Sequence, residues 1–125
     1  IMKRIFAILI GLTLAAGAMW GQEVSNIEQR GNWVYVYDAR GKKACSLSES
    51  SVGTVVGWSS TFWVSHKSNW YYLWTPKGKK YKSISAATVG EVVSVSGDTF
   101  TSRKGNWIYT YKSQGKKINS RYSTR

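Results

Sequence analysis

The sequence predicts an all-β protein built from three tandem repeats, and three observations support this fold class. Trp33, Trp70 and Trp107 are spaced 37 residues apart. A Gly-Lys-Lys triplet recurs at the same interval. After the first 22 residues, alternating runs of aromatic and β-branched residues are separated by turn residues, which is typical of strands, and no window shows a helical period. An internal period of this length indicates a repeat architecture.

The boundaries of the repeats follow from aligning the chain with itself at this interval. The copies span residues 22–51, 52–88 and 89–125, and together they form one predicted domain. The segment VGTVV in the second copy matches VGEVV in the third. The first copy has no such segment, because its place falls at residues 15–19, inside an apolar N-terminal stretch. The first repeat is therefore expected to have three strands, or a gap that another segment fills.

Each complete repeat is predicted to contain four short antiparallel strands. In the third copy these strands are expected at 92–96, 99–104, 107–111 and 116–122. The pairs Gly97-Asp98 and Gly105-Asn106 supply turns between them. The remaining loop ends in Gly115, which suits the left-handed position of a hairpin bulge.

The third strand of each repeat indicates how the sheets pack. Successive side chains of a strand face opposite ways, so Trp107 and Tyr109 share one face while Ile108 lies on the other. Both faces are apolar or aromatic, whereas a sheet with one face in water alternates with polar residues. We therefore expect small sheets stacked face to face. The repeated aromatic residues of this strand are the predicted core between the sheets: Trp33, Trp70, Trp107, Tyr35, Tyr72 and Tyr109.

Four-stranded antiparallel repeats that stack in this way predict a propeller-like arrangement. The hairpin NWVYVYDARGKK, residues 32–43, resembles the third and fourth strands of propeller blades of the NHL type, with their I-x-V-(Y/F)-D-x-x-G-K pattern. The resemblance implies three blades. Propellers close with four to eight blades, so two chains would complete a six-bladed ring as a homodimer. The alternatives are a β-trefoil, SH3-like repeats, or another self-sufficient three-fold β-domain.

Residues 1–21 have the layout of a secretory signal peptide. Lys3 and Arg4 precede an apolar run at 5–16, and small residues follow before Gln22. Cleavage is expected after Ala18 or Gly21, and an uncleaved anchor is the alternative. The apolar run is short for a bilayer span. The sequence thus predicts an exported bacterial protein, periplasmic or extracellular, that is not an integral membrane protein after cleavage.

The net charge of the exported part favours anionic partners in general and does not point to one particular ligand. After the signal peptide, 16 basic residues stand against six acidic ones, a net charge of +10. Such a surface attracts polyanions, although high net charge also serves solubility alone. No nucleic-acid-binding motif is present.

The residue types needed for catalysis are scarce. His66 is the single histidine and Cys45 the single cysteine, and neither sits in a known catalytic motif. The acidic residues show neither the spacing of a carboxylate pair nor that of a metal site. We therefore expect no enzyme activity, no cofactor and no metal. A Cys45–His66 pair, and a hydrolase or inhibitor with an unrecognised site, are the weaker hypotheses.

Two groups of residues are predicted to bind a ligand. The first group is the basic residues in the repeated loops: Arg40, Lys42, Lys43, Lys77, Lys79, Lys80, Lys116 and Lys117. The alternative is that these lysines bind nothing and only protect exposed strand edges. The second is the set of aromatic residues that do not repeat: Trp58, Trp63 and Trp74. The predicted function is a non-catalytic module that binds a glycan or another polyanionic component of the cell envelope. The alternative is a structural, self-assembling β-repeat protein without a small ligand.

Overall fold

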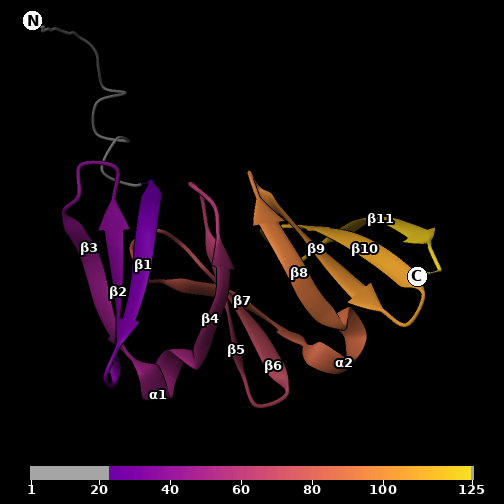
Figure 1. Cartoon of the computed structure of the whole chain (residues 1–125), viewed down its shortest axis with the longest axis horizontal. Coiled ribbons are helices and arrows are strands. Elements are labelled where there is room, and N and C mark those ends of the chain that lie inside the picture. Colours follow the sequence, from indigo (N-terminus) through magenta and orange to yellow (C-terminus); the bar gives the residue numbers. More distant parts are fainter. Residues whose placement is uncertain (1–22, 125) are drawn as a thin grey trace, which may run out of the picture.

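The computed structural model describes residues 23–124, so the predicted signal peptide lies outside the described part. The chain forms three separate antiparallel sheets that do not close into a barrel (Figure 1). The first sheet contains β1 (Val24–Arg30), β2 (Trp33–Asp38) and β3 (Lys43–Ser48). The middle sheet contains β4 (Thr54–Trp58), β5 (Trp63–Lys67), β6 (Trp70–Trp74) and β7 (Lys80–Ser85). The last sheet contains β8 (Glu91–Ser96), β9 (Thr99–Lys104), β10 (Trp107–Lys112) and β11 (Lys117–Tyr122).

Each sheet is one repeat, and its strands pair in the order in which they occur in the chain. The all-β class, the three tandem repeats and the antiparallel pairing are confirmed. The first sheet has no counterpart of β4 and β8 among the described residues and is three-stranded, as expected. A trefoil or an SH3-like domain would close its strands around a barrel, so these alternatives do not describe the observed sheets.

Two helices of four residues, which the sequence pattern did not indicate, join the sheets. They are α1 (Glu49–Val52) and α2 (Ala86–Val89). The hydroxyl of Ser48 caps α1 by accepting from the backbone N–H of Ser50, and the N–H of Gly53 donates to Glu49 O at the other end. Gly53 has φ of +83°, and a Cβ there would lie 2.4 Å from His66 O. A helix of one turn is too short to produce a helical period, so its only sequence signals are the serine cap and this glycine.

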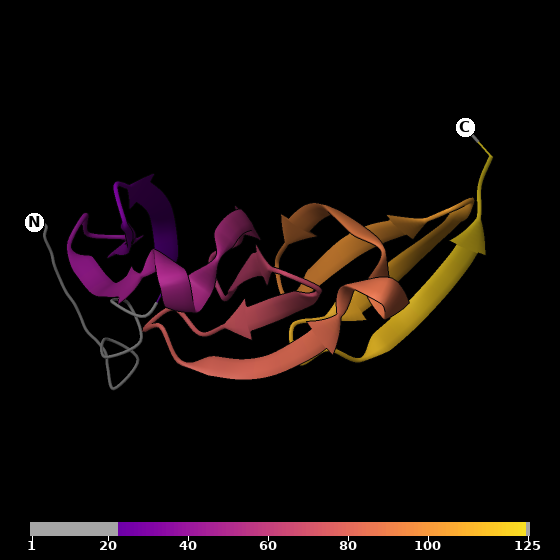
Figure 2. The ribbon, with the colours of Figure 1, turned by 90° about the horizontal axis from the view of Figure 1, so that it is seen from below.

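The sheets stack face to face along the long axis of the molecule, with the first and the last sheet at opposite ends of the stack (Figures 1 and 2). One buried cluster lies between the first and middle sheets, where Val34 and Val36 meet Trp63 and Trp74. A second lies between the middle and last sheets, with Phe62, Val64, Leu73, Phe100 and Tyr111 among its members. The middle sheet is therefore buried on both faces, as its third strand predicted.

The prediction that Trp33, Trp70 and Trp107 form this core is wrong. Their side chains are 48%, 46% and 43% exposed. Each one opens its strand directly after a two-residue turn, at the margin of its sheet. The neighbouring sheet does not extend over Trp70 and Trp107, and Trp33 lies on the outer face of the first sheet. The apolar area between the sheets comes instead from residues nearer the middle of the strands.

The tyrosines of the same strands differ from one another. Tyr72 and Tyr109 are partly buried and pack against the two core clusters, in agreement with the predicted role. Tyr35 lies on the outer face of the first sheet, where no sheet formed by residues 23–124 packs against it. The guanidinium of Arg30 stands 4.6 Å from the centre of its ring. Tyr35 is therefore part of a surface layer and not of the core between sheets.

Candidate functional site

The basic loops have one backbone structure in all three sheets. In each loop a residue at the end of the preceding strand, or directly after it, donates its N–H to the carbonyl of the first lysine of the triplet. The pairs are Asp38 to Lys42, Thr75 to Lys79 and Lys112 to Lys116, each over 2.8 Å. The glycine before that lysine has a positive φ of 80°, 89° or 91°. The three Gly-Lys-Lys segments therefore leave their sheets in equivalent geometry. We call residues 38–42, 75–79 and 112–116 the loop row.

The second and third loops of the loop row pack on the neighbouring sheet. The loop between β6 and β7 packs on β3, where the Cys45 thiol reaches Pro76 O at 3.9 Å. A Cβ on Gly78 would lie 2.7 Å from Cys45 Sγ, which explains the glycine at this close approach. The loop between β10 and β11 packs in the same way on β7, with Gly115 against the side chain of Lys82. The second and third loops thus each touch the preceding sheet just beyond that sheet's own loop.

The two lysines of each triplet have different surroundings. The second lysine lies over the ring of a tyrosine on the adjacent strand. Nζ of Lys43 is 5.1 Å from the Tyr35 ring centre. The corresponding distances are 4.1 Å for Lys80 over Tyr72 and 4.4 Å for Lys117 over Tyr109. These contacts are cation–π interactions that hold the second lysine on its own hairpin.

The first lysine of each triplet is exposed and remains available to a ligand. Within residues 23–124 the ion pairs are Glu28–Arg30, Asp38–Arg40 and Asp98–Lys112, so none involves a lysine of the triplets. The available cations of the loop row are these three lysines and one residue that precedes Lys79 in its loop: Lys42, Lys79, Lys116 and Lys77. Arg40 was also predicted to bind, but its guanidinium pairs with Asp38 at 3.5 Å. In every repeat a tyrosine stands eight residues before the second lysine, but this spacing alone does not show that the two side chains meet.

Asp38 is the one buried acidic residue in the loop row, and its role is local. Its Oδ1 accepts from the backbone N–H groups of Arg40, at 2.9 Å, and Lys42, at 3.0 Å. Burial acts to raise the pKa of Asp38, but these two N–H groups and the Arg40 guanidinium outweigh burial and leave the pKa lowered. The carboxylate therefore stays ionised at neutral pH and braces the first loop.

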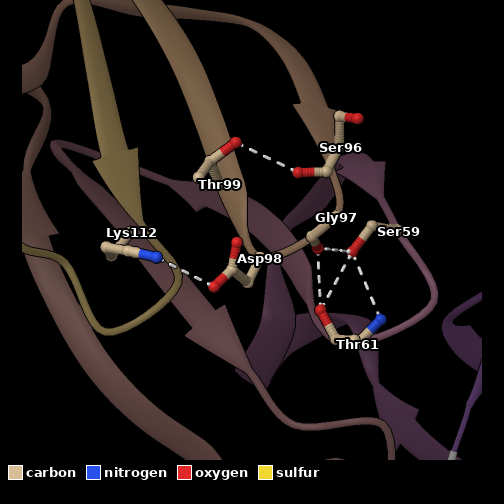
Figure 3. A network of polar contacts seen from close by, with 7 residues as sticks. All are labelled: Ser59, Thr61, Ser96, Gly97, Asp98, Thr99 and Lys112. Atoms are coloured by element: carbon tan, nitrogen blue, oxygen red, sulfur yellow. Dashed lines mark hydrogen bonds and ion pairs between the residues drawn. The ribbon is translucent and has the colours of Figure 1, made fainter. Parts of the chain in front are cut away.

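A second group of contacts fixes the last sheet to the middle sheet at the same strand ends as the loop row (Figure 3). The Ser59 and Thr61 hydroxyls, in the turn between β4 and β5, donate to Gly97 O at 2.5 and 2.7 Å. Nearby, Lys112 Nζ donates to Asp98 Oδ2 at 3.1 Å. This pairing removes Lys112 from the set of available cations.

Two of the three aromatic residues predicted to bind a ligand are core residues, and that prediction is wrong for them. Trp63 is fully buried and Trp74 is 5% exposed. Their rings stack with centres 4.9 Å apart, and their indole N–H groups donate to Thr75 O and Ser65 Oγ. They do not repeat because the space between each pair of sheets is filled by a different combination of rings. Trp58 in β4 is 39% exposed, so it is open to solvent.

Cys45 and His66 do not form a pair. Cys45 lies on the face of the first sheet that packs against the middle sheet, at Val36 in the strand register. The His66 ring packs on Tyr71, a member of the cluster on the other side of the middle sheet, with ring centres 4.7 Å apart. Burial raises the pKa of the Cys45 thiol to about 11. A thiol of this kind is a poor nucleophile at neutral pH, because only the thiolate attacks.

Comparison with known protein families, with curated proteins and with solved structures finds no match to this chain. In the part of the chain that the structure describes, no three histidine, cysteine or acidic side chains gather where they could hold a metal ion. None of the helices in residues 23–124 has the length and apolar character needed to cross a membrane. The function is therefore inferred from the loop row and from the exposed aromatic residues.

Proposed function

We propose that the protein is an exported, non-catalytic binding module that recognises an anionic glycan or another polyanionic component of the cell envelope through the loop row. The observation that carries this proposal is the equivalent geometry of three basic loops, of which the second and third pack on the preceding sheet. The repeats stack like three blades of a propeller-type arrangement. In this stacking the loops follow equivalent strands and lie on the same side of the stack. Loops gathered on one face are commonly the binding face of a repeat protein.

The physical basis of binding is the addition of several weak contacts. A single exposed lysine gains little from one anionic group, because water and salt screen the interaction. A polymer that bridges several loops turns later contacts into intramolecular ones, which raises the overall affinity without any new kind of contact. Lys42, Lys79 and Lys116 supply one such contact in each repeat. Binding of this type is expected to weaken as salt concentration rises.

The experiment that tests the proposal compares two triple variants of equal charge. The loop variant carries Lys42→Ser, Lys79→Ser and Lys116→Ser. The control variant carries Lys67→Ser, Lys104→Ser and Arg121→Ser, which removes the same charge from exposed residues outside the loop row. Binding to heparin and to alginate, as a sulfated and a carboxylated glycan, is measured over a range of salt concentrations.

The loop variant is expected to lose about tenfold or more in affinity, which corresponds to about 1.4 kcal/mol. The control variant is expected to lose much less. An equal loss in both variants would show that binding depends on net charge and not on the loop row. Unchanged binding in the loop variant, or no binding by the unmodified chain, would contradict the proposal.

A further inference from the structure

The three tryptophans that proved to be exposed occupy equivalent positions in the three sheets, at the strand ends opposite to the loop row. Trp33, Trp70 and Trp107 each begin the strand that follows a two-residue turn, whereas the loop row follows the far end of those same strands. The short helices α1 and α2 lie at the same strand ends as the tryptophans (Figures 1 and 2). The near-equal exposure of the three side chains, 43–48%, shows that the repeat preserves an exposed indole. We call these three residues the tryptophan row.

The backbone at each position is held in one conformation. The carbonyl of the asparagine before the tryptophan accepts an N–H from the residue that follows the last strand of the same sheet. The pairs are Asn32 with Glu49, Asn69 with Ala86 and Asn106 with Ser123, over 2.7–2.8 Å. A tryptophan loses little conformational entropy on binding, because it has two side-chain torsions and here starts from an anchored turn. The indoles are thus presented as rigid flat surfaces.

Each of these indoles has a basic residue opposite it on one neighbouring strand, namely Arg30, Lys67 or Lys104. On the other neighbouring strand the first two indoles have a small polar residue. In the strand register Trp33 lies opposite Ser48 and Trp70 opposite Ser85, and serine leaves the neighbouring ring uncovered. A cleft of about 380 Å³ lies beside the first of these positions and is lined by Asn32, Ser48, Glu49 and Ser50. Trp107 instead lies opposite Tyr122, and the two rings meet edge to face with centres 5.4 Å apart.

We propose that the tryptophan row binds the pyranose rings of an extended, uncharged polysaccharide. The apolar C–H face of a pyranose stacks on an indole, while its hydroxyl groups need amide, hydroxyl and carboxylate partners. The cleft beside Trp33 offers all three kinds of polar group. A globular protein otherwise buries large aromatic side chains, so an exposed tryptophan that recurs in every repeat indicates a binding surface. A protein partner would require a continuous apolar patch, but asparagine, serine and basic residues lie next to the indoles.

One chain has to reach more than one indole to be held tightly. A single sugar ring on one exposed tryptophan is a weak contact, and the contacts add when one polymer spans neighbouring sheets. Affinity is therefore expected to rise with the length of the oligosaccharide. This inference goes beyond the proposed function, because it concerns different residues, an uncharged ligand and the strand ends opposite to the loop row.

The test measures binding of cello- and chito-oligosaccharides, from disaccharide to hexasaccharide, by tryptophan fluorescence and calorimetry at low and high salt. The binding variant carries Trp33→Ala, Trp70→Ala and Trp107→Ala in the whole chain. The matched control is Trp58→Ala, which removes an indole of similar exposure in β4, outside the row. Heparin binding serves as a second readout for both variants.

The expected result is binding that strengthens with oligosaccharide length, varies little with salt, falls at least about tenfold in the triple variant and persists in Trp58→Ala. Heparin binding should be retained by the triple variant, which separates this site from the loop row. If the triple variant fails to fold, Trp33→Ala alone is informative, because Trp33 lies on an outer face without a neighbouring sheet. Failure of the unmodified chain to bind either sugar series would overturn the inference, as would an equal loss in Trp58→Ala or a triple variant that binds normally.

Discussion

Ser65 and Ser102 occupy the same position in consecutive repeats and are both fully buried, but their hydroxyl groups have different surroundings. Ser65 Oγ accepts a hydrogen bond of 2.9 Å from the indole N–H of Trp74. In the last sheet Tyr111 stands in place of Trp74, and Ser102 Oγ has no hydrogen-bond partner among the described residues. The repeat therefore contains its own comparison between a satisfied and an unsatisfied buried hydroxyl.

Ser65→Ala is expected to lower the free energy of unfolding by about 1–3 kcal/mol, because it leaves a buried indole N–H without an acceptor. Ser102→Ala is expected to leave the free energy of unfolding unchanged or to raise it, because it removes a polar atom that gains no bond in the folded state. Urea denaturation of both variants measures these changes. Similar losses in the two variants would contradict this explanation.

Burial of individual residues is where the sequence predicted least well. Alternation along a strand correctly indicated which side chains share a face, and for the middle sheet it correctly indicated that both faces are covered. It did not indicate how far along each strand the neighbouring sheet extends. Trp70 and Trp74 lie on one face of β6, yet the first is 46% exposed and the second 5%. That difference depends on the packing of sheets from separate repeats, which no local pattern contains.

At the scale of the hairpin, the two lysines of a triplet are expected to contribute differently to stability. Lys80→Gln removes the cation that lies 4.1 Å from the Tyr72 ring centre, and should lower the free energy of unfolding by about 0.5–1 kcal/mol. Lys79→Gln changes an exposed residue without such a contact and should alter it by less than about 0.5 kcal/mol.

Thermal or urea denaturation of the two single variants provides the measurement, and both lose the same charge. The double variant Lys80→Gln with Tyr72→Leu completes a cycle that isolates the interaction between this lysine and its ring. An interaction energy of zero in the cycle would show that the contact contributes nothing to the hairpin.

The repeated elements were predictable because each one carries local signals. Turn glycines, alternating strands and the 37-residue interval placed all the strands of the middle and last sheets. Helices α1 and α2 were missed because one turn of helix has no period. The candidate binding site was predicted in part: the spacing of the triplets identified the basic loops. The division between cation–π lysines and available lysines needed the register of β6 and β7, which sequence spacing alone does not fix.

Across the whole molecule, the two end faces of the stack differ in composition from the faces inside it. On the outer face of the first sheet, Asn26 takes the position that Trp63 has in the middle sheet. Glu28 and Arg30 form an ion pair of 3.2 Å on the same face. On the outer face of the last sheet, Thr101 and Thr110 take the positions of the buried Val64 and Leu73.

These polar replacements, together with the Arg30 guanidinium over the Tyr35 ring, reduce the apolar surface of the outer faces, as an open stack requires. Trp33 is the large apolar side chain that stays exposed on the outer face of the first sheet. Terminal repeats of stacked proteins need a polar outer face, because no neighbour covers them. The sequence argument for a homodimer came from the count of three repeats, which is too few to close a ring. The replacements are visible in the sequence, but their meaning depends on knowing which face of each end sheet is the outer one, and that became clear only from the stacking.

We therefore expect the chain to be a monomer in solution, with its repeats stabilised by the two internal clusters alone. Size exclusion coupled to light scattering should give the mass of one chain, and Thr110→Arg on the outer face of the last sheet should change neither this mass nor the stability by more than about 0.5 kcal/mol. A mass of two chains that Thr110→Arg reduces to one would instead support closure of two chains into a six-sheet ring, since a charge placed inside that interface would have no partner. In that case the loop rows of both chains would join into one continuous basic ring, and a polyanion would contact twice as many loops.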